Sequence, residues 1–279
     1  MHIRHHDNQN QPIIDRNHEK VPLCFFNIIK LKKGEHFSSQ VDGYETCLVP
    51  ATGSFDVTVQ GETFERVGKR MNIWESEPEG VYVPVGVQAD VTCVTDEVEI
   101  FVAGAQFDEV YHPFVVRESD IDPIQYGSDD TKTHRKIKHI LGKNPSGKVG
   151  RLLVSELFTV GAGGWSGFPP HKHDTDQLPG ETRHDEVYNF RFNPPHGFGA
   201  QFLTPEGADY GDVHHIRNGS TIVIEDGYHP CVAAPGYEMY YFTILGGLSQ
   251  RPLHQNFHPE HAYQIETIPG IKDMISKFK

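Results

Sequence analysis

Two histidines separated by one residue, His171 and His173, are the most direct sign of chemistry in this sequence. Alternate side chains of a β-strand point to the same face, so both imidazoles can reach one ion while Lys172 points away from it. Histidine is also the commonest metal ligand in proteins. The spacing favours a metal site, although two surface histidines would give the same pattern, so further ligands must decide.

Two residues further along the chain complete a candidate ligand set. Glu186 begins an apolar alternating run over 186–190, which can direct its carboxylate into an interior, and His229 follows a tight Asp-Gly turn. Three imidazoles and one carboxylate leave one or two positions open for water or substrate, as catalytic metal sites require. We predict that one divalent ion is held by His171, His173, Glu186 and His229. The alternatives for the acidic ligand are Asp174, Asp176, Glu181 and Asp185.

Short β-strands are the elements that must position these ligands. Residues 55–60 alternate apolar and polar side chains, and residues 220–224 and 240–245 are rich in β-branched and aromatic types. Gly, Pro, Asn and Asp lie between such runs, as they do at turns. A helix is expected only over 272–279. The pattern predicts an all-β fold, either a sandwich or a barrel.

The two halves of the chain resemble each other as a degenerate repeat does. Gln88 falls where His229 falls and Glu45 falls near Glu186, but no histidine pair precedes Glu45. We therefore expect that only the second half binds metal. The predicted units are a metal-free barrel over 20–120, a charged linker over 121–148, a metal-binding barrel over 149–262 and a tail over 263–279.

Charge and hydropathy argue against two classes of partner. The formal net charge is −13 over 279 residues, and an acidic protein repels the phosphates of nucleic acids. No apolar run reaches the ~18 residues that span a bilayer, and the polar residues 1–20 lack the apolar core of a signal peptide. The four cysteines are scattered without a CxxC pair, so we expect reduced thiols and a cytoplasmic protein.

Longer strings around the predicted ligands resemble those of a known family. They are WSGFPPHKHD at 165–174, EVY at 186–188, GF at 197–198, GYHP at 227–230, PGY at 235–237, YY at 240–241, ETCLV at 45–49, VYVP at 81–84 and HRKIKHIL at 134–141. Together, residues 24–262 resemble the 5-deoxy-glucuronate isomerases of bacterial myo-inositol breakdown, which are bicupins of the cupin superfamily. The resemblance implies two tandem cupin barrels, each a double-stranded β-helix or jelly roll, with the N-terminal one degenerate.

The resemblance also implies a metal-dependent aldose–ketose isomerase that converts 5-deoxy-glucuronate to 5-keto-2-deoxy-gluconate. A divalent ion can polarise the carbonyl and the neighbouring hydroxyl while a general base moves the proton between adjacent carbons. Because no redox change is needed, zinc or manganese is expected, and iron, nickel and cobalt also suit the ligands. The partner is a small sugar acid, and by analogy of fold alone two copies can pair as a homodimer.

Further residues receive roles from this reaction. Buried phenols can act as donors, the base can be Glu181, Glu186 or a metal-bound water, and the substrate carboxylate needs a cationic or hydroxyl-rich pocket. Strand alternation, however, points Lys172 and Arg191 away from the metal face. The candidate catalytic residues are Glu186, Tyr241, Tyr188 and Lys172. The candidate substrate-binding residues are Arg183, Arg191 and Gln201.

Three positions depart from the pattern of the resembled family. Phe202 replaces a basic residue, Glu225 replaces a proline, and Thr243 replaces an asparagine of the last strand. If a lost side chain contacts substrate, the chain isomerises a related sugar acid instead. A metal-dependent cupin dioxygenase, which would consume oxygen, and a sugar-acid sensor without turnover are the alternatives from other functional classes.

Overall fold

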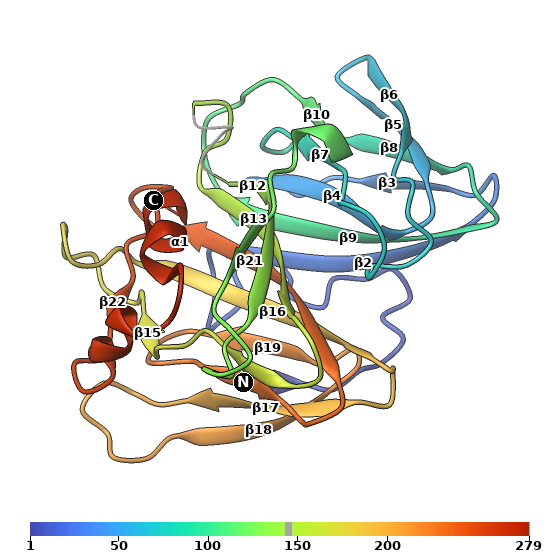
Figure 1. The fold of residues 1–279 in the computed structure, drawn as a ribbon. Coiled ribbons are helices and arrows are strands. Elements are labelled where there is room, and N and C mark those ends of the chain that lie inside the picture. The colour runs from blue at the N-terminus through green and yellow to red at the C-terminus, as the bar shows by residue number, and fades with distance from the viewer. Residues whose placement is uncertain (143–146, 279) are drawn as a thin grey trace.

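Strands form nearly all the regular structure of the chain, as the sequence predicts. The structure is a computed structural model that describes residues 1–142 and 147–278, the side chains of 277 and 278 excepted. Two β-barrels lie against each other, the N-terminal one blue to green and the C-terminal one mostly yellow to orange in Figure 1. The prediction of an all-β fold with tandem barrels is therefore confirmed.

The N-terminal barrel consists of two facing antiparallel sheets. Its strands are β2 (Cys24–Lys32), β3 (His36–Ser39), β4 (Tyr44–Thr52), β5 (Phe55–Val59), β6 (Glu62–Val67), β7 (Gly80–Val83), β8 (Ala89–Cys93), β9 (Glu97–Gln106) and β10 (Phe114–Val116). One sheet has the order β10-β7-β4-β9-β2 and the other the order β3-β8-β5-β6. The alternating residues Val57, Ile100 and Val102 fill the space between the sheets, which explains the period-two pattern of these segments.

The C-terminal barrel repeats this plan with a wider first sheet. Its strands are β1 (His2–Ile3), β11 (Ile124–Tyr126), β12 (Arg135–Leu141), β13 (Leu152–Thr159), β14 (Gly164–Ser166), β15 (His171–Lys172), β16 (His184–Asn193), β17 (Phe198–Leu203), β18 (Asp212–Arg217), β19 (Thr221–Ile224), β20 (Cys231–Ala233), β21 (Glu238–Gly247) and β22 (Asn256–Phe257). The first sheet has the order β1-β19-β16-β21-β13-β12-β11. The second has the order β14-β20-β17-β18, and β15 pairs with β22.

Strand order supports the internal repeat. The order β7-β4-β9-β2 in the first barrel matches β19-β16-β21-β13 in the second, and β3-β8-β5-β6 matches β14-β20-β17-β18. The registers agree as well, because Thr46 lies opposite Val83 and Glu186 lies opposite Ile224. Thr46, rather than its neighbour Glu45, is therefore the first-barrel counterpart of Glu186.

Glu45 has a structural role at the contact between the two barrels. Its carboxylate is fully buried and accepts hydrogen bonds from the backbone N–H groups of Gly150 (2.8 Å), Arg151 (2.5 Å) and Leu152 (2.7 Å) and from the Tyr82 hydroxyl (2.6 Å). A one-residue shift on a strand turns a side chain to the opposite face. Glu45 therefore ties the start of β13 to the first barrel instead of facing that barrel's interior.

The two barrels share a large apolar interface between their first sheets. Phe242 of β21 packs against Phe101 of β9, with ring centroids 4.9 Å apart, and against Phe26 of β2 at 6.3 Å. A buried ion pair also crosses the interface, because Arg70 donates two hydrogen bonds to the Glu156 carboxylate of β13. The interface positions the back wall of the second barrel.

The segment expected as a linker is largely part of the second barrel. Residues 121–148 contain β11 and β12, and β12 pairs along its length with β13; of this segment, residues 143–146 lie outside the described residues. The many charged residues of β12 made its strand pattern hard to recognise. Ile137, between Lys136 and Lys138, is nevertheless buried in the barrel core. Lys138 is itself buried and paired with Glu77 (3.0 Å), so charge did not mark exposure here.

The tail expected over residues 263–279 closes one end of the second barrel. It holds a 3₁₀ turn, η2 (Ala262–Glu266), and the helix α1 (Ile271–Phe278), drawn in red beside β15 and β22 in Figure 1. Ile271 and Met274 of α1 belong to the barrel's apolar core. No helix in the described part of the chain is long and apolar enough to cross a membrane. The four cysteines are free and buried, as expected.

Candidate metal centre

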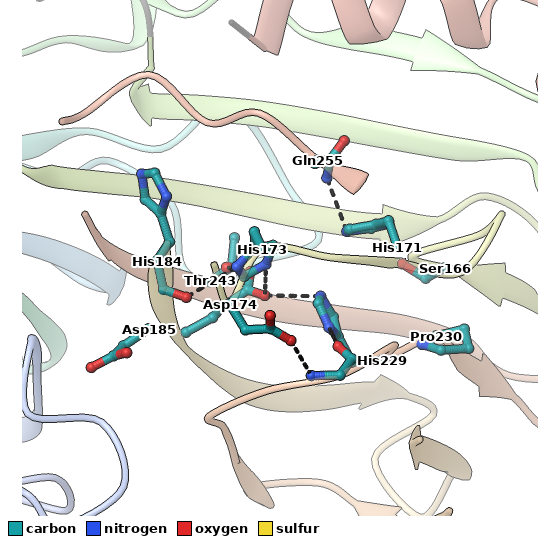
Figure 2. A network of polar contacts seen from close by, with 12 residues as sticks. Ser166, His171, His173, Asp174, His184, Asp185, His229, Pro230, Thr243 and Gln255 are labelled. Carbon is teal, nitrogen blue, oxygen red and sulfur yellow. Dashed lines mark hydrogen bonds and ion pairs between the residues drawn. The ribbon is translucent and has the colours of Figure 1, made fainter. Parts of the chain in front are cut away.

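Three separate elements bring the predicted ligands together. β15 and the residue after it carry His171 and His173, β16 carries Glu186, and the turn between β19 and β20 carries His229. One nitrogen from each of the three imidazoles lies within 4.8 Å of the others. Figure 2 shows the three rings converging inside the barrel, and all four side chains are at most 9% exposed. The cluster is therefore a built interior feature and not a surface group.

The distances from Glu186 to the two nearest imidazoles are those expected between ligands that share one ion. Its Oε2 lies 3.1 Å from His173 Nε2 and 3.3 Å from His229 Nε2. Ligands bound at ~2.1 Å are separated from one another by roughly 3.0–3.4 Å in octahedral or tetrahedral geometry. The His229 Nε2 is buried and has no hydrogen-bond partner among the described residues. The donor set and its spacing therefore fit a divalent metal ion.

Backbone carbonyls fix the orientation of all three imidazoles. The Nδ1 atoms of His171, His173 and His229 lie 3.3, 3.0 and 2.8 Å from the carbonyl oxygens of Pro169, His184 and Gly227, respectively. A carbonyl can only accept, so each Nδ1 carries a hydrogen, and Nε2 is the nitrogen of each ring that can bind metal once it is unprotonated. Gln255 reaches His171 Nε2 at 2.9 Å and must withdraw when that nitrogen binds an ion.

The shifted pKa values of His171 and Glu186 suit metal binding, whereas His173 shares a proton with Glu186 that an ion would displace. Burial and the neighbouring rings of His229 and His173 hold the pKa of His171 well below its usual range. Burial alone would raise the pKa of Glu186, but the hydrogen bond with His173 and the nearby His229 ring outweigh it and hold that pKa low. Burial likewise lowers the pKa of His173, yet the Glu186 carboxylate leaves it raised. Thr243 donates a 2.7 Å hydrogen bond to Glu186 Oε1 and fixes the carboxylate further.

The cluster opens onto a cavity inside the second barrel. Tyr188 and Tyr241 line it, and burial raises the pKa of both phenols, so they keep their protons at neutral pH. Apolar side chains and the C-terminal segment complete the wall. These wall residues are Ile137, Leu157, Phe168, Leu245, Leu253, Gln255, Phe257, Ile271 and Met274.

Lys172 belongs to a network outside this cavity. Its Nζ lies 2.9 Å from Asp174 Oδ1, 2.9 Å from Glu181 Oε2 and 3.2 Å from Glu206 Oε2. Burial lowers the pKa of Lys172, but the carboxylates outweigh it and raise the pKa, so the amine stays charged. Glu181 also accepts from the side chain of Asn256 (3.0 Å). Lys172 and Glu181, predicted as catalytic candidates, lie in a network that joins the strand of the candidate ligands to β22.

Asp174 connects that network to His229. Its Oδ2 accepts from the Gly227 N–H at 2.8 Å, and the Gly227 carbonyl accepts from His229 Nδ1, also at 2.8 Å (Figure 2). Although burial raises the pKa of Asp174, the hydrogen bonds from Gly227 and Lys172 lower it to about 2. The carboxylate is therefore ionised at neutral pH and orients His229, a candidate metal ligand.

Asp174→Asn is expected to weaken metal binding by roughly 10- to 100-fold, because residues that orient metal ligands contribute on that scale. The measurement is the dissociation constant for Zn²⁺ in competition with a chromophoric chelator. Asp176→Asn is the matched control, since Asp176 is exposed and accepts from the Arg183 N–H outside the cluster. Equal affinities of the two variants would contradict the role of Asp174.

The three predicted substrate-binding residues do not reach the cavity. Arg183 has a 41% exposed side chain near Asp185, and Arg191 bonds to Glu99 of the first barrel at 2.9 Å. Gln201 is buried but donates to the His229 carbonyl at 2.7 Å, so it supports the turn that carries this ligand. Strand alternation explains Arg191, which points to the interface side of β16.

Arg135 is the cationic residue that does line the cavity, and sequence reasoning missed its role. It lay in the segment expected as a linker, so its place on a strand was not recognised. Four further lining residues were also missed: Gln255 just before β22, Phe257 on β22, and Ile271 and Met274 on α1. The signal available in the sequence was the alternation through Arg135, Ile137 and His139 on β12.

The three departures from the resembled family have different surroundings. Thr243 contacts Glu186 directly. Phe202 packs on Trp165 at 5.6 Å between ring centroids, and Glu225 forms an exposed ion pair with Lys20 at 2.9 Å. Of the three, Thr243 is therefore the one that can alter chemistry at the cluster.

Comparisons with known proteins agree with this architecture. The family model described as KduI/IolB matches residues 1–264. The chain is 33% identical to the 5-deoxy-glucuronate isomerase of Geobacillus kaustophilus (strain HTA426) over 246 residues, which is 87% of this chain and 86% of that protein. It is 28% identical to the 5-deoxy-glucuronate isomerase of Listeria innocua serovar 6a over 255 residues, 90% of this chain and 92% of that protein.

Solved structures show the same fold. An IolB-like protein from Salmonella typhimurium LT2 superposes with a TM-score of 0.80 at 30% identity, covering 86% of this chain and 89% of that one. The oxalate decarboxylase of Lactobacillus farciminis superposes with a TM-score of 0.64 at 10% identity, covering 96% and 90%. At that identity the second likeness concerns the fold alone, which is the double barrel that the strand order describes.

Proposed function

Because the chain belongs to the KduI/IolB family, we propose that it is a metal-dependent aldose–ketose isomerase that converts 5-deoxy-glucuronate to 5-keto-2-deoxy-gluconate in inositol catabolism. The observation that carries the proposal is the buried cluster of His171, His173 and His229 beside Glu186, facing a cavity whose described lining includes phenols and the cation Arg135. Relatives that match most of the chain bear the name 5-deoxy-glucuronate isomerase. The small sugar acid is the partner that this reaction requires.

The metal is assigned from the chemistry of the donors. His171, His173, Glu186 and His229 would hold one divalent ion, with zinc or manganese expected before iron, nickel or cobalt. When bound, the ion supplies Lewis-acid polarisation of the substrate's carbonyl and adjacent hydroxyl. The free, buried thiols of the chain fit a reducing compartment, and we place the enzyme in the cytoplasm.

Side chains that line the cavity supply the other functions that the reaction needs. Glu186 is the carboxylate that the described residues contribute to the cavity wall, and its lowered pKa keeps it ionised, which suits a metal ligand better than a carrier of the transferred proton. The protonated hydroxyls of Tyr188 and Tyr241 donate hydrogen bonds to substrate oxygens. The apolar wall, which includes Leu157 and Leu245, excludes water and so protects the enediol from side reactions.

Removal of the metal is expected to abolish conversion of 5-deoxy-glucuronate, and added Zn²⁺ or Mn²⁺ is expected to restore it. The measurement follows keto-product formation by NMR for protein treated with a chelator, dialysed, and reloaded with each metal in turn. Undiminished turnover by fully metal-depleted protein would contradict metal dependence. Oxygen consumption by iron-loaded protein without isomerisation would favour the dioxygenase alternative instead.

A further inference from the structure

Arg135 is a buried charge in the cavity that the roles above leave unused. It is the first residue of β12, its residue exposure is 2%, and its side chain lines the same cavity as the metal-ligand candidates. Its Nη1 donates to the Tyr126 hydroxyl at 3.2 Å and its Nη2 to the Tyr241 hydroxyl at 2.9 Å. The guanidinium is therefore held in place by two neutral phenols.

The hydrogen-bonding capacity of Arg135 exceeds what these phenols accept. A guanidinium has five N–H donors and stays protonated in proteins. Within the described part of the chain, Nε has no hydrogen-bond partner and no carboxylate lies within ion-pair distance of the side chain. Three N–H groups are thus available, and a planar pair of them matches the two oxygens of a carboxylate.

Other buried cations of the described chain have a carboxylate or several backbone carbonyls as acceptors, whereas the acceptors of Arg135 are two phenols. Arg70 pairs with Glu156, Lys172 pairs with Glu181, and Arg251 donates to the backbone carbonyls of Leu141, Gly142 and Leu152. A buried charge without a counter-charge is costly to the folded state. Its retention inside a cavity is explained when a ligand supplies the missing anion.

The cavity has two chemically different ends. Glu186 of β16 lies opposite Leu245, near the end of β21. Lys136, next to Arg135 on β12, lies opposite Phe158 of β13, and Phe158 lies opposite Tyr240, near the start of β21. Between the ends lie two aromatic rings, because Tyr188 is 4.5 Å from Tyr241 and 6.3 Å from His229 between centroids. The metal-ligand candidates and the cation therefore line one cavity at two positions separated by these rings.

We infer that Arg135, together with the hydroxyls of Tyr126 and Tyr241, binds the carboxylate of an open-chain sugar acid whose carbonyl end lies at the metal ligands. This assignment rests on the proposed function for the identity of the acid, but the observation behind it is the unpaired guanidinium. Ser166 Oγ, 2.5 Å from the Tyr241 hydroxyl, keeps that phenol in place. Arg135 then selects acids over neutral sugars and sets which end of the substrate meets Glu186.

The test compares an acid with its neutral counterpart. Dissociation constants are measured by calorimetry on metal-loaded protein for 5-deoxy-glucuronate and for the sugar in which a hydroxymethyl group replaces the carboxylate. The variants are Arg135→Met, Arg135→Lys and, as matched control, Lys136→Met on the opposite face of β12. Metal content and thermal unfolding are recorded for each, and turnover is followed in parallel.

We expect Arg135→Met to weaken binding of the acid by roughly 10- to 100-fold while changing binding of the neutral sugar by less than about threefold. Arg135→Lys should fall between, since it keeps the charge and loses the fork of donors. Lys136→Met should retain the wild-type preference for the acid. In turnover, the Arg135 variants should show a raised KM for the acid more than a lowered kcat.

Two results with the Arg135→Met variant would overturn the inference. Equal weakening of acid and neutral sugar in Arg135→Met would mean that Arg135 only supports the tyrosine rings, and an unchanged preference would mean that the carboxylate binds elsewhere. Failure of the proposed function gives a separate signature, in which the wild type binds the acid with an Arg135-dependent preference yet does not isomerise it. Absence of acid binding by metal-loaded wild type would overturn both.

Discussion

Replacing His229 with alanine is expected to remove the bound metal and to lower kcat/KM by roughly three orders of magnitude, because the ion's Lewis-acid stabilisation is worth several kcal/mol. The His229 ring is buried, holds its Nδ1 on Gly227, and has its Nε2 3.3 Å from Glu186. The measurement is metal stoichiometry by elemental analysis together with turnover of 5-deoxy-glucuronate.

His215→Ala is the matched control for that experiment. His215 lies on β18 of the same barrel, is exposed, and packs edge-on against Phe198 away from the cluster. It should keep full metal content and activity. If His229→Ala retained stoichiometric metal and near-normal turnover while folding normally, the assignment of the metal centre would be contradicted.

Replacing Arg70 with methionine is expected to lower the free energy of unfolding by about 3–5 kcal/mol, since it leaves a buried carboxylate without its partner. The Glu156 carboxylate is fully buried, and besides Arg70 it accepts a 3.0 Å hydrogen bond from the Tyr240 hydroxyl. Because the pair joins the two barrels, the loss should also disturb the wall that carries the active site. Urea unfolding followed by tryptophan fluorescence measures the change.

The double variant Arg70→Met with Glu156→Met should recover much of that loss, because apolar groups of similar volume replace the pair. Arg16→Met provides a surface comparison. Arg16 pairs with Asp42 at 3.2 Å with side chains 45% and 73% exposed, and such pairs contribute about 0–1 kcal/mol. Comparable losses for Arg70→Met and Arg16→Met would show that the interface does not depend on the buried pair.

The convergence of the four candidate ligands could be predicted from sequence because its signals are local. An alternating pair places His171 and His173 on one strand face, and Glu186 opens a run whose alternation sends it to the barrel interior. His229 follows a turn whose glycine has a φ of 77°, a conformation that favours this residue type. The structure brings these four side chains together.

The substrate end of the cavity could not be predicted in the same way. Arg183 and Arg191 are close in sequence to Glu186, but each has a carboxylate partner outside the cavity. Arg135 is distant in sequence and is brought into the barrel by the pairing of β12 with β13. Long-range strand pairing leaves little local trace, particularly where the strand is rich in charge.

The boundaries of the two barrels were hard to predict from sequence for the same reason. Residues 121–148 have the polar composition of a linker, yet β11 and β12 extend the sheet of the second barrel. The polar N-terminal residues also join that barrel, since β1 pairs with β19 across more than two hundred residues of sequence. The boundary between the barrels is therefore better placed before β11, with β1 assigned to the second barrel.

The most direct test of the account is conversion of 5-deoxy-glucuronate by metal-loaded protein in deuterated water. The account predicts that 5-keto-2-deoxy-gluconate forms, and that deuterium appears at the carbon next to the new carbonyl, because a base in the cavity exchanges its proton with solvent during transfer. No keto product from folded protein with a full complement of zinc or manganese would contradict the assignment of this substrate and this reaction.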